Sequence, residues 1–173
     1  MSVGFYKTGV VKGSGNEIGK NIVSGTQNFS GWTTNAIFTT SVEDGFTVKS
    51  AVSSGVTSNS WRRVVSPYID YEDVKDGIIV SYMFKCDDYS ALDHQCMCAL
   101  QTYNSSDSRV GWVEPTLSNA NTLHEDLIDG KWIKVAQKFT AANTSYVASG
   151  YTGPVTKINV TFNIVKNGSV HFK

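Results

Sequence analysis

Apolar and polar residues alternate most regularly near the C-terminal end of the chain, between Val155 and Lys166. Side chains of a β-strand alternate between its two faces with a period of two. The segment therefore predicts a strand with one buried and one solvated face. The apolar set comprises Ile158, Val160, Phe162 and Ile164, and the polar set comprises Lys157, Asn159, Thr161 and Asn163.

The residues after this segment predict a turn and a second strand. A three-residue loop, Lys166-Asn167-Gly168, with the glycine in the left-handed conformation places Phe162 opposite Phe172 and keeps the apolar residues on one face. A two-residue Asn-Gly loop would instead place Ile164 opposite a histidine. The longer loop is therefore favoured, and the chain is predicted to end in an antiparallel hairpin.

Similar apolar runs recur along the chain, separated by segments rich in Gly, Ser, Asp and Asn. About nine short strands with such linkers are typical of a sandwich or barrel. One short helical turn is predicted within residues 117–127. The predicted strands are Thr33–Thr40, Gly45–Val52, Trp61–Ser66, Ile78–Cys86, Gln95–Tyr103, Arg109–Glu114, Lys131–Thr140, Val155–Lys166 and Ser169–Lys173.

Composition supports an all-β class. Twenty valines stand against five leucines, and serine and threonine together number thirty-six. Valine and threonine suit a pleated, half-exposed surface, whereas leucine and alanine favour helices. A chain of 173 residues is long enough to bury the core of one domain.

The first twenty residues differ from the rest, because they contain five glycines and few apolar residues. They predict an N-terminal arm (residues 1–20) before a sandwich domain (residues 21–173), although an ordinary edge strand of that sandwich fits the same residues. If the arm anchors the domain to a partner, its apolar residues are the candidate anchors: Val3, Phe5, Val10, Val11 and Ile18.

Charge and hydropathy argue against several partners. The formal net charge is zero, and the only notable basic cluster is Arg62-Arg63, so no basic face for nucleic acid is predicted. No apolar run approaches the roughly twenty residues of a membrane-spanning helix, so membrane insertion is not expected. The N-terminus has no apolar segment typical of a secretory signal, so export by the general secretory route is not expected either.

The three cysteines are predicted to be buried thiols. Cys96 and Cys98 lie two apart in a predicted strand, on the same side as His94, and Cys86 ends the preceding strand. A Cys/His cluster is a potential zinc site, but Cys-x-Cys within a strand holds the two sulfur atoms apart. Small apolar thiols in a reducing compartment explain the pattern better, and no metal is predicted.

No catalytic residue or cofactor is predicted. The sequence contains no Gly-x-Ser-x-Gly motif, and its three histidines lie in unrelated contexts. A glycosidase needs a pair of carboxyl groups, and Glu114 with Glu43 or Asp126 is conceivable from residue type alone. Exposed carboxylates are more often solvated than catalytic, so the chain is not expected to be an enzyme.

Two tryptophans lie beside arginines and are the best candidates for a sugar site. Stacking on a sugar requires a flat aromatic face next to hydrogen-bonding groups. Trp61 follows a polar loop and precedes Arg62 and Arg63. For Trp61 and Trp112, packing in the core stays open as the alternative. Trp32 and Trp132 are expected to be structural residues that pack against the rest of the domain. The second candidate group is Trp112 with Arg109 and Glu114.

Several stretches together resemble carbohydrate-binding-module-like jelly rolls found in virion proteins of tailed bacteriophages and prophages. The resemblance covers residues 21–173. Such domains usually continue into a short acidic tail, which sometimes supplies a calcium ligand, and the resemblance does not include that tail. The stretches are Ile78-Ile-Val-Ser-Tyr-Met-Phe-Lys, Leu100-Gln-Thr-Tyr-Asn-Ser-Ser-Asp-Ser-Arg-Val-Gly-Trp, Leu127-Ile-Asp-Gly-Lys-Trp-Ile-Lys-Val-Ala-Gln-Lys-Phe-Thr, an opening Asn21-Ile-Val-Ser-Gly-Thr and a closing Gly168-Ser-Val-His-Phe.

The resemblance implies an antiparallel jelly-roll sandwich and a phage virion accessory or decoration protein. Such a protein would be assembled in the host cytoplasm and released by lysis, which agrees with the lack of a secretory signal. Its expected partners are other capsid or tail proteins and bacterial cell-surface polysaccharide, with a homo-oligomer also expected. Two alternatives stay open: a purely structural decoration protein without glycan binding, and a bacterial carbohydrate-binding or glycoside-processing domain.

Overall fold

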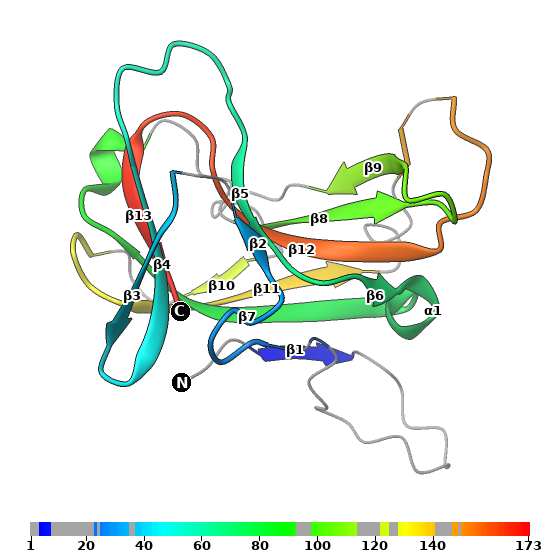
Figure 1. The fold of residues 1–173 in the computed structure, drawn as a ribbon, viewed down its shortest axis with the longest axis horizontal. Coiled ribbons are helices and arrows are strands. Elements are labelled where there is room, and N and C mark those ends of the chain that lie inside the picture. Colours follow the sequence, from blue (N-terminus) through cyan, green and yellow to red (C-terminus); the bar gives the residue numbers. More distant parts are fainter. Residues whose placement is uncertain are drawn as a thin grey trace.

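The computed structural model shows an all-β sandwich of two antiparallel sheets with jelly-roll architecture, as predicted (Figure 1). Its only helical segments among the described residues are α1 (Tyr71–Val74) and the 3₁₀ turn η1 (Tyr89–Ala91). The structure describes residues 4–7, 23, 25–34, 37–92, 98–113, 122–124, 128–140, 147–148 and 150–173.

Each sheet is built from strands that are distant in sequence. Sheet A runs in the order β10 (Thr122–His124), β11 (Ile133–Thr140), β7 (Gly77–Cys86), β13 (Gly168–Phe172), β4 (Phe46–Ser53) and β3 (Thr39–Glu43), and β1 (Gly4–Lys7) also pairs with β7. Sheet B runs in the order β2 (Thr33–Thr34), β5 (Arg62–Val65), β12 (Lys157–Ile164), β8 (Cys98–Tyr103) and β9 (Arg109–Val113), and β6 (Ile69–Asp70) also pairs with β12.

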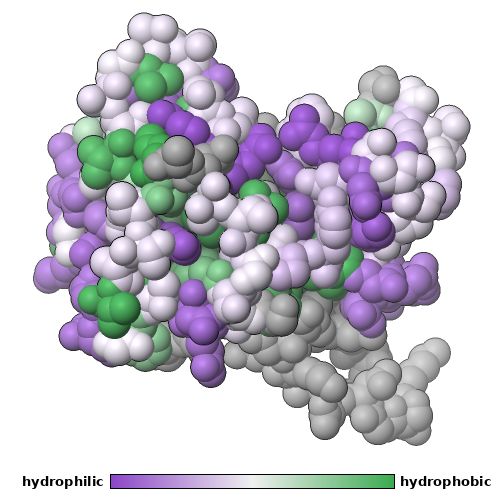
Figure 2. Space-filling model, viewed as in Figure 1, coloured by the Kyte–Doolittle hydropathy of each residue, from purple (hydrophilic) through white to green (hydrophobic). Residues whose placement is uncertain are grey.

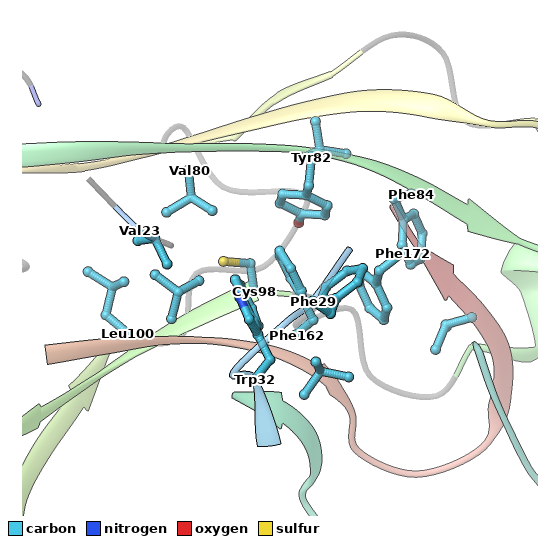
Figure 3. Close-up of a cluster of buried hydrophobic side chains, with 14 of the residues drawn as sticks. Val23, Phe29, Trp32, Val80, Tyr82, Phe84, Cys98, Leu100, Phe162 and Phe172 are labelled. Atoms are coloured by element: carbon cyan, nitrogen blue, oxygen red, sulfur yellow. The ribbon is translucent and has the colours of Figure 1, made fainter. Parts of the chain in front are cut away.

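Aromatic rings from both sheets meet in the core between them (Figure 3). Phe162 of β12 stacks on Phe172 of β13, with ring centroids 5.0 Å apart and planes inclined by 15°. Trp32 stacks on the same Phe162 at 5.7 Å, and Tyr82 contacts it at 4.7 Å. The prediction that Trp32 packs in the core is therefore confirmed.

The predicted C-terminal hairpin is wrong, because β12 and β13 belong to different sheets. In Figure 1 the chain leaves the end of β12 and crosses to sheet A before β13 begins. Gly168 does have a positive φ of 144°. The alternating pattern identified the buried face of each strand correctly, but two sheets facing one another satisfy that pattern as well as two neighbouring strands do. Phe162 and Phe172 therefore meet across the core.

The predicted solvated face of β12 is also wrong. Asn159, Thr161 and Asn163 have only 4, 0 and 2% of their surface exposed. Strand β12 is paired with β5 on one side and β8 on the other, so side chains of the neighbouring strands cover its outward residues. A polar stripe is therefore buried on the outer face of sheet B.

Two further predicted elements differ from the structure. The predicted strand Thr33–Thr40 is divided between β2 in sheet B and β3 in sheet A, and Phe38 between them packs near Phe172 in the core. The predicted helical turn in residues 117–127 is wrong over Thr122–His124, which form strand β10. The rest of that segment lies outside the described residues.

Part of the predicted N-terminal arm belongs to the sandwich. Residues Gly4–Lys7 form β1, which is antiparallel to β7 with Gly4 opposite Ser81. This placement agrees with the alternative interpretation of an edge strand for these four residues. The anchor candidates Val3, Val10, Val11 and Ile18 lie outside the described residues, and of Phe5 only the backbone is described. The anchoring role of residues 1–20 stays a prediction.

Two of the cysteines are buried, free thiols, as expected. Cys98 points into the core between the sheets (Figure 3). Burial raises the pKa of the Cys86 thiol, which keeps it neutral. Cys96 and His94 lie outside the described residues.

Candidate functional site

A hollow of about 280 Å³ lies on the outer face of sheet B. In Figure 2 the surface is indented between two lobes, one of which carries the loop that precedes β5. The strand register explains which residues face the hollow. Asn163 of β12 pairs with Arg63 of β5, and Gln101 of β8 pairs with Trp112 of β9, so these four share one face of the sheet.

Two tryptophan–arginine pairs line the hollow. The guanidinium carbon of Arg63 lies 5.5 Å from the ring centroid of Trp61, and that of Arg109 lies 5.6 Å from the ring centroid of Trp112. Such cation–π contacts hold a guanidinium group against its ring. Trp112 keeps 40% of its surface exposed, which is unusual for so large an apolar ring. Its exposure makes aromatic surface available to a ligand.

The hollow also has buried polar lining residues, among them Thr161 and Asn163 of β12. Thr161 donates a hydrogen bond to the carbonyl of Ala99, and the Asn163 amide nitrogen donates to the carbonyl of Thr161, both at 3.4 Å. The buried Oδ1 of Asn163 accepts no hydrogen bond from the residues that the structure describes. A buried polar atom without a partner costs about 1–3 kcal/mol. Because Asn163 lines the hollow, a ligand bound there is well placed to engage this side chain.

The polar network continues along sheet B beyond the hollow. The Tyr103 hydroxyl donates to Gln101 Oε1 at 2.7 Å and accepts from the Asn159 amide at 3.1 Å. Tyr68, which is 48% exposed, packs edge-on against Tyr103 with ring centroids 5.0 Å apart. Lys157 pairs with Asp107 beside them. This end of the sheet offers a second aromatic surface, but its charged groups are paired with one another.

Four of the six predicted ligand-binding residues line the hollow: Trp61, Arg63, Arg109 and Trp112. Arg62 does not, because neighbouring residues of a strand face opposite sides. Its guanidinium group donates to the Ser53 hydroxyl, to the Lys166 carbonyl and to the Ser60 carbonyl, so it joins the two sheets. Glu114 lies outside the described residues.

Sequence analysis missed the other residues of the hollow: Asn59, Ala99, Gln101, Thr161 and Asn163. The alternation along β12 identified the polar stripe but interpreted it as solvated. A signal was present, since a strand that carries threonine and two asparagines on one face is unusual in a sheet centre. Without knowledge of the strand order, however, nothing in the sequence placed β12 between β5 and β8.

A second tryptophan cluster lies on the outer face of sheet A. Trp132 Nε1 donates to Glu43 Oε1 at 2.8 Å. The ammonium groups of Lys85 and Lys173 lie 4.9 and 4.2 Å from its ring centroid. The hydrogen bond from Trp132, together with the nearby lysines, lowers the pKa of Glu43. Trp132 therefore packs at the sheet surface, as predicted, and Glu43 is engaged in this cluster.

Ser50, His171 and Asp87 form a hydrogen-bonded chain on the same face of sheet A. The Ser50 hydroxyl lies 2.8 Å from His171 Nδ1, and Asp87 Oδ1 lies 3.2 Å from His171 Nε2. These residue types also form hydrolase triads, which additionally need unengaged N–H donors for an oxyanion. Ser50 is paired with strands on both sides, so the backbone around it belongs to the sheet ladder. The chain is best explained as a cross-strand structural network.

The described part of the chain has neither a metal-binding cluster nor a membrane-spanning helix. No group of three or more His, Cys, Asp or Glu residues lies there in an arrangement that could hold a metal ion. No helix among the described residues has the length and apolar character needed to cross a membrane.

Comparisons with known proteins found distant structural similarity and no match by sequence. No family model matches the sequence, and no curated protein matches it. Among solved structures, the chain is similar to the CBM22-1 xylan-binding domain of Paenibacillus barcinonensis Xyn10C, with 11% identity and a TM-score of 0.45 over 84% of this chain and 83% of that one. It is also similar to TmCBM27, a mannan-recognising carbohydrate-binding module, with 8% identity and a TM-score of 0.34 over 84% and 86%.

Proposed function

We propose that this protein binds a polysaccharide in the hollow on the outer face of sheet B. One observation carries the proposal: two tryptophans line a hollow in which the buried oxygen of Asn163 has no hydrogen-bonding partner among the described residues. A stable fold tolerates such an atom poorly, so a ligand that supplies the missing donor explains it.

The lining residues match the chemistry of a sugar ring. The C–H surface of a pyranose packs against an aromatic face, which Trp61 and Trp112 supply. Sugar hydroxyls donate and accept hydrogen bonds, so one hydroxyl can donate to Asn163 Oδ1 while others accept from the arginines. A few placed polar groups beside apolar surface are typical of ligand sites, and the volume lies near the lower end of the usual range of about 300–1,000 Å³.

The proposed activity is binding without cleavage. Glycoside hydrolysis requires two carboxyl groups on either side of the scissile bond. The described residues that line the hollow include no aspartate or glutamate. Glu43, one of the carboxylates considered from the sequence, lies on the outer face of sheet A beside Trp132.

The proposal is tested by measuring binding of the full chain to a panel of purified polysaccharides and bacterial cell walls. We expect Trp61→Ala and Trp112→Ala each to weaken binding at least tenfold, with the fold retained by circular dichroism. Trp132→Ala is the matched control, because it removes a tryptophan from the other sheet. Absence of binding by the folded wild-type protein would contradict the proposal. So would a large loss of stability in both hollow variants, since that would make the two rings core residues.

The setting expected from the sequence, display on a bacteriophage particle as a homo-oligomer, stays a prediction. Many copies on one particle would strengthen weak individual binding through avidity. Deletion of residues 1–20 is a poor test of anchoring, because Gly4–Lys7 pair with β7. Replacing Val10 and Val11 with aspartate leaves β1 intact, and we expect it to abolish particle attachment if these residues are anchors. Unchanged attachment would favour a different anchor.

A further inference from the structure

We infer that the ligand of the hollow is an acidic polysaccharide whose sugar carboxylates are bound by the arginines. This inference rests on the proposed function and narrows its substrate class. The charged residues among the described lining of the hollow are Arg63 and Arg109, and both are positive. The whole chain has a formal net charge of zero, so this local excess of positive charge is not a general property of the protein.

Several other cations of the chain have partners within the protein. Lys157 forms an ion pair with Asp107. Arg62 donates hydrogen bonds to Ser53 of sheet A and to two backbone carbonyls, and on sheet A the Lys85 ammonium group lies 3.6 Å from a carboxylate oxygen of Glu43. Arg109 is exposed and forms no ion pair within the part of the chain that the structure describes. Its charge is therefore available to an anionic ligand.

The geometry favours a planar anion. A guanidinium group presents a rigid fork of N–H donors that matches the two oxygens of a carboxylate. Contact of Arg109 with the Trp112 ring restricts the position of that fork at the side of the hollow. Asn163 Oδ1, in contrast, needs a hydrogen-bond donor, which a carboxylate lacks and a hydroxyl supplies. A uronic acid carries both groups on one sugar ring, so it can place a carboxylate at the exposed Arg109 while its hydroxyls meet the polar lining residues.

The test compares polygalacturonate with the same polymer after its carboxylates have been reduced to neutral alcohols. We expect carboxyl reduction and Arg109→Gln each to weaken binding at least tenfold, and we expect added salt to weaken binding to the acidic polymer only. Lys138→Gln is the charge-matched control, because Lys138 is an exposed residue of β11 in the other sheet. Its binding should equal that of the wild type.

Three results would overturn the inference, and each is distinguishable from failure of the proposed function. Equal binding of the reduced and acidic polymers would show that carboxylates are not recognised. Binding of the neutral polymers xylan and mannan as tightly as polygalacturonate would show the same. Either result would leave polysaccharide binding intact. Equally tight binding of dextran sulfate would indicate general attraction of anions. Absence of binding to every polysaccharide in the panel would remove the proposed function together with the inference.

Discussion

Both sheets carry tryptophan and cationic side chains on their outer faces, but the two faces differ in how their polar atoms are paired. On sheet A, Trp132 donates to Glu43 and lies against two lysines, one of which pairs with the same carboxylate. On sheet B, Trp61 and Trp112 line a hollow, and the Asn163 oxygen there is buried without a partner. The first cluster is complete within the protein, whereas the second is not.

This difference separates a structural cluster from a candidate binding site more clearly than residue type does. Hydrogen-bonding groups that satisfy one another stabilise the sheet to which they belong. A buried acceptor without a donor lowers stability, and beside the aromatic rings of a hollow it marks a candidate binding site. The outer face of sheet B therefore carries the functional prediction, although sheet A has the denser network.

The largest expected effect is a loss of stability on removing the sheet A tryptophan. Trp132→Ala should lower the free energy of unfolding by about 2–3 kcal/mol, because a half-buried ring and its hydrogen bond to Glu43 are lost. Chemical denaturation measures this change, and polysaccharide binding by the folded variant should be unaffected. Weakened binding at unchanged stability would move the site to sheet A.

The opposite outcome is expected for the polar lining of the hollow on sheet B. Asn163→Leu keeps the branching at Cγ and removes the unpaired oxygen, and its larger side chain borders the hollow, so stability should change by less than about 1 kcal/mol or increase. Polysaccharide binding should fall at least about tenfold, which corresponds to roughly 1.4 kcal/mol. Calorimetric titration and thermal denaturation of the same sample measure both quantities. A destabilised variant that binds normally would show that Asn163 serves the fold.

Arg62 and Arg63 are neighbours in β5, and their substitutions should have smaller effects that separate stability from binding. Arg62→Gln should lower stability by about 1–2 kcal/mol, because Arg62 of sheet B hydrogen-bonds Ser53 of sheet A and the Lys166 carbonyl. Arg63→Gln should mainly weaken binding, since Arg63 lines the hollow. Equal effects of the two substitutions on binding would contradict the assignment of their faces.

The smallest expected effect concerns the pH dependence of the Trp132 cluster. Because the hydrogen bond from Trp132 lowers the pKa of Glu43, the folded state favours the charged carboxylate. Its stabilisation is complete above the ordinary carboxyl pKa and is lost as the pH falls below that value and through the lowered one. Trp132→Phe keeps a ring but removes the donor, so unfolding free energy should depend less on pH in this window. An unchanged slope would exclude this hydrogen bond as the cause.

The sequence predicted the class of fold and much of each strand, because side-chain alternation records which face of a strand is buried. It did not predict strand partners. Phe162 and Phe172 were expected to meet as neighbours in a hairpin, and they meet instead across the core from opposite sheets. Alternation is equally compatible with both arrangements, since it contains no information about which strand lies beside which.

The candidate site was predictable only in part, because its lining depends on strand partners as well as on side-chain alternation. Tryptophan next to arginine at Trp61 and Trp112 indicated stacking and hydrogen-bonding groups together, and both tryptophans line the hollow. Which of Arg62 and Arg63 lines the hollow depends on which of them faces outward. Whether the polar side chains of β12 are buried depends on the central position of that strand in sheet B. Both are consequences of pairing between strands distant in sequence.

The most direct test of the account is to observe the four tryptophan indole N–H signals by ¹H–¹⁵N NMR while an acidic polysaccharide fragment is added. Single Trp→Phe variants assign the signals. We predict that the Trp61 and Trp112 signals shift with a common saturation curve, whereas those of Trp32 in the core and Trp132 on sheet A stay in place. Binding that shifts the Trp132 signal and leaves Trp61 and Trp112 unchanged would contradict the central claim that the hollow on sheet B is the binding site.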